Sequence, residues 1–414
     1  MNNWEDLMNG WIKDTDVSPR QAKRTIQTFL AYLGNDVGVL EIKRETHIND
    51  VKGHGYTFRK YLIENLKSGR SKNVILSHLE KFFDYVGLQC NAIGKGFSNP
   101  ISYKFDKFKI FKKSGTIRQA LPFNIIEEMK RTLFANNFQL SKDCLKQDWI
   151  KEMFNHSTGD VDNEIFSYST SIALYLLLSI PLRGIQVQLL DSGEKDEFVY
   201  DFNLNKMVKN PNGEKGRKEG FIRKKSYSGI RLEERESLWI STNKGSCGYE
   251  LPYINQEILG LIRLQSEFLN QYSPNPIKVD KSSLGKEIKG SSPKFYCLLR
   301  DLTKAGDRPV SKSKINKLWR ELCIEVENNT GFRLVDDGKY LYSIHSLRVS
   351  GITNFLELGI SLETVSKYLV AHADLEMTQY YQRKRGVRDL LNESQHSLGM
   401  VFNFDIKQIE EKKE

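Results

Sequence analysis

The region from 340 to 385 holds the densest group of side chains able to act on a phosphate. His345 and Arg348 are three residues apart, so a helix would present both on one side. An arginine fork matches phosphate oxygens, and histidine exchanges a proton near neutral pH. A neighbouring tyrosine, Tyr380 or Tyr381, could attack a phosphodiester. Each of these residues alone is also typical of an ordinary helix surface or core, so the interpretation depends on the rest of the chain.

Two further cations lie upstream of this region. Arg183 follows an apolar segment, 167–180, which predicts a helix that ends at Pro181. An unpaired cation in such surroundings is costly, which favours a functional guanidinium over a charge at a helix end. Lys244 falls at the turn of a hairpin predicted over 237–254.

The elements before residue 100 predict a small helical domain. Helical patterns cover 18–34, 56–67 and 72–86, and the last of these is expected to end at Gly87. Ser18 suits the first helix as its N-cap, and Gly34 suits its end. In the third helix, apolar residues recur at helical spacing and form the predicted packing stripe: Ile75, Leu76, Leu79, Phe82, Phe83 and Val86.

A basic segment, 101–120, separates this domain from the next and is interpreted as a linker. Over 101–122 there are six Lys and Arg residues and one acid, Asp106, which give the segment a net charge of +5. Such a segment is either a solvated linker or one that crosses a DNA backbone, because phosphate contacts need only flexible cations.

The second domain is predicted over 121–390. A helix opens it near residue 123, residues 139–165 have a polar composition typical of loops, and 197–243 is strand-like. Helices are expected again from 253 and over 311–327. Between 206 and 231 there are nine basic residues and two acids, which give a net charge of +7. This charge indicates a solvated loop or an extra phosphate contact.

Composition narrows the class of protein. The chain has 414 residues, a formal charge of +10 and a pI near 9.1, which suit a polyanionic partner such as nucleic acid. Its five cysteines form no CxxC pair, and no phosphate-binding glycine loop occurs, so neither a zinc cluster nor an NTP-driven enzyme is predicted. The first residues lack a signal-peptide pattern, and Pro181 breaks the longest apolar run. We therefore expect a cytoplasmic, nucleoid-associated protein without a membrane segment.

Collected in chain order, the candidate catalytic residues are Arg183, Lys244, His345, Arg348, His372 and Tyr381. Their order and spacing resemble the tyrosine recombinase (phage-integrase-type) family, over roughly residues 15–390. The match is closest in HSLRVSGITNFLELGISLETVSKYLVAHADLEMTQYYQR, and Lys244 precedes Pro252 by eight residues, as in related integrases. The family spacing from His372 selects Tyr381 as nucleophile. Tyr380 is then assigned to packing, since neighbours on a helix point about 100° apart.

The sequence departs from the family pattern at several places. Gln186 stands where a Glu is common, Val349 where a His is common and Ala371 where a Gly is common. The interval between Arg183 and Lys244 is longer than usual, which predicts an insertion at about 195–235.

The resemblance implies a mainly α fold with a small β-sheet (α+β), a helical SAM-like core-binding domain at 1–100 and a mixed α/β catalytic domain. It implies that Arg183 and Arg348 clamp the phosphate, His345 accepts the tyrosine proton and Lys244 protonates the departing 5′ hydroxyl. His372 would hydrogen-bond the phosphate. No cofactor or metal is expected. The implied partners are double-stranded DNA and further copies of the chain, as a tetramer on synapsed DNA. The tail 391–414 would contact a neighbouring protomer or fold back on its own domain.

Two other functions share parts of this pattern. A type IB topoisomerase uses the same catalytic set, although the helical N-terminal domain and short tail favour a recombinase. A DNA-binding protein that kept the fold without the chemistry is disfavoured, because all six catalytic groups are present.

Overall fold

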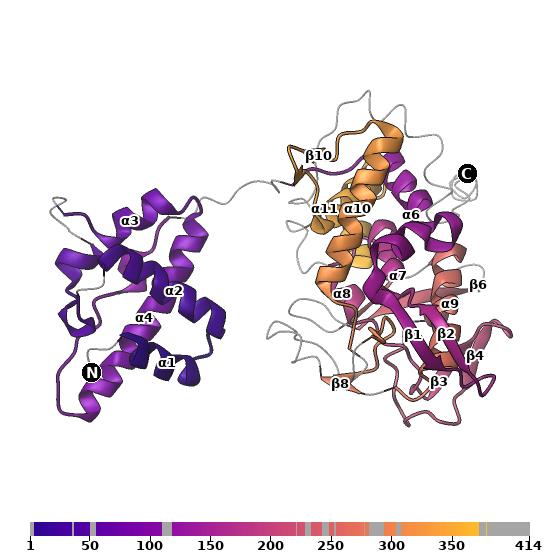
Figure 1. The fold of residues 1–414 in the computed structure, drawn as a ribbon, viewed down its shortest axis with the longest axis horizontal. Helices are drawn as coiled ribbons and strands as arrows, with labels where there is room; N and C mark the ends of the chain where they lie inside the picture. The colour runs from indigo at the N-terminus through magenta and orange to yellow at the C-terminus, as the bar shows by residue number, and fades with distance from the viewer. Residues whose placement is uncertain are drawn as a thin grey trace. The chain divides into compact units, whose positions relative to one another are not determined.

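The computed structural model forms two compact units, Met1–Lys113 and Ser114–Glu414, each with its own core (Figure 1). The described residues are 4–34, 37–49, 55–109, 118–220, 222–227, 233–241, 248–251, 254–276, 278–280, 294–303, 308–371 and 378.

The first unit is helical, as predicted. Its core is aromatic: Phe29, Phe58, Phe82 and Phe83 are fully buried. The Ser18 hydroxyl accepts a hydrogen bond from the Gln21 amide at 3.4 Å and caps the second helix. The helices are α1 (Trp4–Asp14), α2 (Pro19–Leu33), η1 (Val39–Glu41), η2 (Arg44–Ile48), α3 (Phe58–Asn65), α4 (Gly69–Ala92) and α5 (Tyr103–Asp106).

Helix α4 does not end at Gly87, so that prediction was wrong. The predicted packing stripe is buried, and it continues beyond Val86 to Cys90, whose exposed fraction is 1%. Burial of this extra turn outweighs the roughly 1 kcal/mol that a glycine costs inside a helix.

The beginning of the predicted linker packs on the first unit instead of running through solvent. Asp106 is fully buried and accepts two hydrogen bonds from the Arg44 guanidinium, at 2.8 and 2.6 Å. Asn73 and Phe108 exchange side-chain-to-backbone bonds of 3.0 and 2.7 Å. The one acid in the basic segment is therefore an internal ion-pair partner, which the charge count alone did not reveal.

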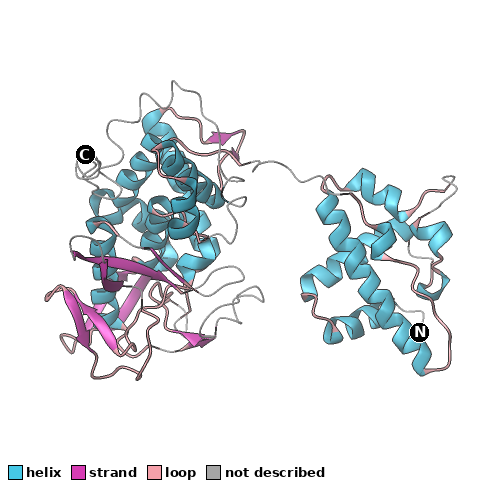
Figure 2. Cartoon of the chain, turned by 180° about the vertical axis from the view of Figure 1, so that it is seen from behind, coloured by secondary structure: helices cyan, strands magenta, loops and turns pink. Residues whose placement is uncertain are grey.

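The second unit is mainly helical with small antiparallel sheets, which confirms the predicted fold class (Figure 2). Helix α7 is buried from Ser169 to Leu178 and packs against its neighbours α6, α9, α10 and α11. The helices are α6 (Phe123–Cys144), η3 (Lys146–Asp148), α7 (Ser169–Ser179), α8 (Gly184–Gln188), α9 (Gln256–Tyr272), α10 (Lys312–Thr330), α11 (Ile344–Glu357), α12 (Leu362–Thr364) and η5 (Val365–Leu369).

The described strands pair in chain order. Strands β5, β6 and β7 form a three-stranded sheet, and the others form two-stranded antiparallel sheets. The strands are β1 (Trp149–Phe154), β2 (Val161–Phe166), β3 (Phe198–Asp201), β4 (Lys206–Lys209), β5 (Ile222–Tyr227), β6 (Glu233–Ile240), β7 (Tyr249–Leu251), β8 (Val279–Asp280), β9 (Lys294–Phe295), β10 (Val335–Asp336) and β11 (Lys339–Tyr340).

The segment 139–165, predicted as loop, is regular structure. Helix α6 continues to Cys144 after a kink at Ala135–Phe138, and β1 then pairs with β2. Most side chains of this hairpin face solvent, so its strands lack the alternation of apolar and polar residues that identifies a half-buried strand. Within the described residues, no helix is both long enough and apolar enough to span a membrane.

Candidate active site

His345 and Arg348 lie one turn apart at the start of helix α11, as their spacing predicted. The helix begins at Ile344, after Ser343, whose amide donates to the Ser346 hydroxyl at 3.1 Å. His345 is half-buried and Arg348 is fully buried. A fully buried guanidinium requires hydrogen-bond partners fixed by the fold.

Arg348 reaches the segment that carries Arg183. Its Nη1 donates to the carbonyl of Pro181, and this segment leads directly into α8. The backbones approach closely here: a Cβ atom at Gly351 would lie 3.0 Å from the Pro181 Cβ. Glycine at 351 thus lets α11 pack on the Pro181 segment and brings Arg183 to the same place as Arg348.

The second Arg348 contact is with a different segment of the chain. Nη2 donates to the carbonyl of Val370 at 3.3 Å, just after η5. A single guanidinium therefore holds both the chain before Arg183 and the chain two residues before His372. The fork geometry suits this task, because it presents several donors in fixed directions.

The site is rich in positive charge around His345. The pKa of His345 is lowered to about 4, first by burial and then by Arg118, Arg348, Arg183 and Lys312. His345 is therefore neutral at physiological pH, and the surrounding cations make the site attractive to an anion.

Arg118 and Lys312 were not among the predicted site residues. Arg118 was counted with the basic segment, and nothing in the sequence distinguishes it from the lysines there. Arg118 lies near α11 because the residues that follow it are attached to that helix. The amide of Leu121 donates to the Ser350 hydroxyl on α11 at 2.7 Å. Lys312 is the first residue of α10.

The remaining predicted residues, Lys244, His372 and Tyr381, lie outside the described residues, as does Tyr380. The hairpin predicted around Lys244 is confirmed by the strands on either side, since β6 pairs with β7 through Leu238–Leu251, Trp239–Glu250 and Ile240–Tyr249. Arg183, His345 and Arg348 are thus the three predicted residues that the structure brings together.

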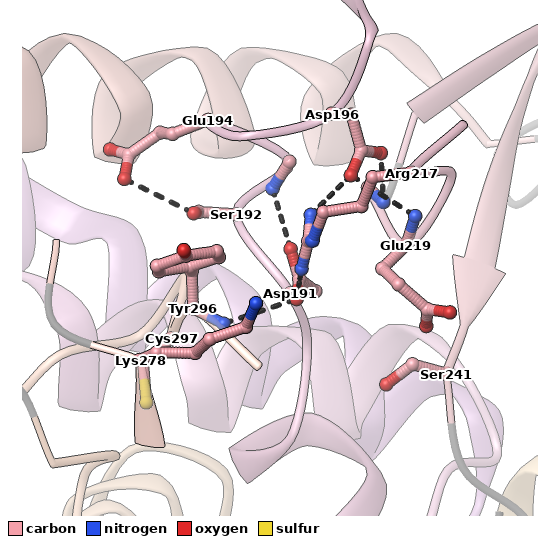
Figure 3. A network of polar contacts seen from close by, with 12 residues as sticks. Asp191, Ser192, Glu194, Asp196, Arg217, Glu219, Ser241, Lys278, Tyr296 and Cys297 are labelled. Carbon is pink, nitrogen blue, oxygen red and sulfur yellow. Dashed lines mark hydrogen bonds and ion pairs between the residues drawn. The ribbon is translucent and has the colours of Figure 1, made fainter. Parts of the chain in front are cut away.

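The predicted insertion is fastened to the unit by a buried polar network (Figure 3). The Arg217 side chain is 8% exposed and lies between the carboxylates of Asp191 and Asp196, donating to both. Asp191 also accepts from the Tyr296 amide at 3.1 Å. The charge count over 206–231 includes Arg217 among the basic residues available to a phosphate. Arg217 is instead committed to an internal ion pair, whereas Lys206, Lys209, Lys215 and Lys218 are exposed.

A nearby arginine reinforces the same region. Arg300 is fully buried, and its guanidinium donates to Glu194 and to the Ser273 carbonyl, the latter at 2.7 Å. Glu194 and Asp196 lie at the start of the insertion, so two buried arginines hold its first residues.

Comparisons with known proteins identify the family. A family model described as "Putative integrase" (Integrase_2) matches residues 1–279. A search of curated proteins finds no match.

Solved structures of DNA recombinases align with most of the chain at low identity. The Tn1549 transposon integrase in complex with transposon right end DNA is 11% identical, with a TM-score of 0.44, covering 94% of this chain and 97% of that one. XerH recombinase in a post-cleavage complex with difH is 12% identical, with a TM-score of 0.45 and coverages of 91% and 80%. Lambda integrase on a COC′ core site is 12% identical, with a TM-score of 0.41 and coverages of 94% and 96%.

These TM-scores are all below 0.5, so the assignment rests on the family model, which matches more than half of the chain. The chain belongs to this integrase family, which confirms the family predicted from its sequence.

Proposed function

We propose that the chain is a site-specific DNA recombinase that cleaves and rejoins strands through a 3′-phosphotyrosyl link, without metal or ATP. Support comes from one observation above all: Arg183, His345 and Arg348, which the sequence selected for phosphate chemistry, lie together around one cation-rich site. The Arg348 guanidinium supports this arrangement by donating to the backbone carbonyls of Pro181 and Val370.

In the proposed cleavage, the Tyr381 oxygen attacks the scissile phosphorus as the bond to the 5′ oxygen breaks. The tyrosine proton passes to His345, and Lys244 supplies a proton to the departing 5′ hydroxyl. Arg183 and Arg348 stabilise the negative charge that grows on the non-bridging oxygens, with a further hydrogen bond from His372. Rejoining reverses these transfers with a different 5′ hydroxyl, so the bond energy is conserved.

The neutral state of His345 suits its role as proton acceptor. A free tyrosine has a pKa near 10 and needs both a base and a positive field. The cations that lower the pKa of His345 supply that field. A bound phosphodiester adds a negative charge beside the imidazole, which raises its pKa and makes it a stronger base when substrate is present.

Double-stranded DNA is the proposed partner. The formal charge of +10 and the exposed lysines of the insertion suit a phosphate backbone. We assign the first unit, Met1–Lys113, to binding the DNA core site and the second to catalysis. A homotetramer on synapsed DNA is part of this proposal.

Covalent trapping tests the proposed function. Duplexes that the protein retains are first selected from a random library, and a nick is then introduced at successive positions along the bound region. When these nicked duplexes react with the protein in the presence of a chelator and without ATP, a covalent adduct should form that survives denaturation. Peptide mapping is expected to place the nucleotide on Tyr381. An adduct on Tyr380 would reassign the nucleophile, and no adduct on any retained duplex would contradict the proposal. A product that joins strands from two duplexes would favour recombinase over topoisomerase.

The pH dependence of cleavage tests the role of His345. Because a base must be unprotonated, the second-order rate of adduct formation should stay level as the pH falls past 6.5, the ordinary histidine value, and decline only near pH 4. With DNA saturating, this decline should move to higher pH, since the bound phosphate favours the imidazolium. The His345 imidazole proton signals, assigned with His345→Gln, provide a direct check. Titration near pH 6.5 in the DNA-free protein would contradict the assignment.

A further inference from the structure

A second tyrosine, Tyr249, enters the site from strand β7. Its hydroxyl oxygen accepts hydrogen bonds from the Arg348 guanidinium and from the Gln186 amide. The same hydroxyl lies 3.5 Å from the carbonyl oxygen of Leu369, on η5. Three separate elements, α8, α11 and η5, thus meet at one phenol group.

Gln186 extends this contact to the other arginine. Its side chain is 1% exposed, and its Oε1 accepts from the Arg183 amide at 2.8 Å. The amide group can accept and donate at once, so it joins Arg183 to Tyr249 without adding charge. Gln186 and Tyr249 therefore form a neutral bridge between the backbone of Arg183 and the guanidinium of Arg348.

The Tyr249 phenol is neutral at the site. Burial raises its pKa, and the opposing effects of Arg348 and Arg183 do not cancel that rise. The phenol therefore stays protonated at neutral pH, in the state that can donate as well as accept a hydrogen bond.

The position of Tyr249 in the chain gives the contact a further consequence. Tyr249 pairs with Ile240 across the β6–β7 ladder, and β7 packs against η5. Residues 241–248, which include Lys244, connect these two strands in the chain. A hydrogen bond from β7 to Arg348 thus ties the hairpin to the arginine pair.

We propose that Tyr249 is a positioning residue of the phosphate site, which acts with Gln186 to orient the Arg348 guanidinium and to fix the β6–β7 hairpin against it. This inference deepens the proposed recombinase function and rests on it. Arg348 must contact Pro181, Val370 and a phosphate with one fork, so its orientation decides how well the phosphate is held.

Tyr249→Phe tests this role, because it deletes the hydroxyl and keeps the ring. The rate of adduct formation at saturating DNA should fall about tenfold, the size expected for one hydrogen bond to a charged group. DNA affinity should change little, because the many other phosphate contacts along the duplex supply most of it. Tyr175→Phe is the matched control: its hydroxyl bonds Glu257 at 2.7 Å, away from the arginine pair, and wild-type cleavage is expected.

A second readout does not depend on cleavage. Inorganic phosphate replacing chloride at constant ionic strength should raise the melting temperature of the wild type, by mass action at the anion site. Arg183→Ala serves as a control: the rise in its melting temperature measures the effect of phosphate bound at other basic surfaces. Tyr249→Phe should bind phosphate about tenfold more weakly than wild type, and Tyr175→Phe equally well.

The outcomes separate this inference from the function on which it rests. If Tyr249→Phe keeps the wild-type response to phosphate and the wild-type cleavage rate, the positioning role is overturned. A wild-type response no larger than that of Arg183→Ala would overturn it as well. If phosphate binding depends on Tyr249 but no adduct forms with the wild type, the recombinase proposal fails and the anion-site role of Tyr249 stands.

Discussion

Arg348→Lys is expected to slow covalent adduct formation by roughly 10²–10³-fold, the usual cost of losing one preorganised donor to a transition-state oxyanion. Lysine keeps the positive charge but not the planar fork. In the native site that fork donates to the carbonyls of Pro181 and Val370, from two separate segments, while completely shielded from solvent. A lysine ammonium cannot keep both contacts and also hold a phosphate oxygen at the same distance.

Single-turnover cleavage of the trapped duplex measures this effect, with urea unfolding to establish that the variant is folded. Arg320→Lys is the matched control, since Arg320 is an exposed arginine on α10 whose guanidinium lies over the Tyr340 ring. A methylphosphonate at the scissile position removes the charge that Arg348 is proposed to hold, so the difference between Arg348→Lys and wild type should shrink there. A loss of less than tenfold on the natural phosphate would contradict the role given to Arg348.

The parts of the site that the sequence predicted are those encoded at short range. His345 and Arg348 are three residues apart, which places both on one side of any helix. Arg183 follows an apolar helix and a proline. An unpaired cation is costly in such surroundings, so a functional role is indicated. The fold class could be predicted in the same way, because the helices of the first unit have both a strong apolar period and end signals such as Ser18.

The remaining contacts depend on which distant segments the fold brings together, and no local pattern encodes that. In the sequence Tyr249 is an ordinary strand residue, and only the fold of β7 places its hydroxyl against Arg348. A charge count treats all cations alike, so it could not tell that Arg217 is paired internally while Lys206 is exposed. The β1–β2 hairpin was missed for a related reason: its side chains face solvent, and the apolar alternation that identifies a strand is absent.

Arg217→Ala is expected to lower the free energy of unfolding of the second unit by about 3–5 kcal/mol, the usual cost of removing one partner from a buried ion pair. The substitution leaves two carboxylates, Asp191 and Asp196, buried at 0% and 6% side-chain exposure without their shared cation. Burial already raises the pKa of Asp196, and Arg217 is the main opposing charge. The contact between Arg217 and the Tyr296 ring, 4.9 Å away, is lost as well.

Urea unfolding across pH measures this effect and separates it from simple loss of packing. Burial raises the pKa of Asp196, and without Arg217 this pKa should rise further above its unfolded value, so the folded variant binds more protons than its unfolded chain. Its stability deficit is then largest near neutral pH and diminishes as the pH falls and the carboxylates are neutralised. Arg263→Ala is the control: its pair with Glu267 is exposed, and the expected loss is below about 1 kcal/mol. A deficit for Arg217→Ala that is as small as the control, or that does not change with pH, would mean that the insertion is not held by this ion pair.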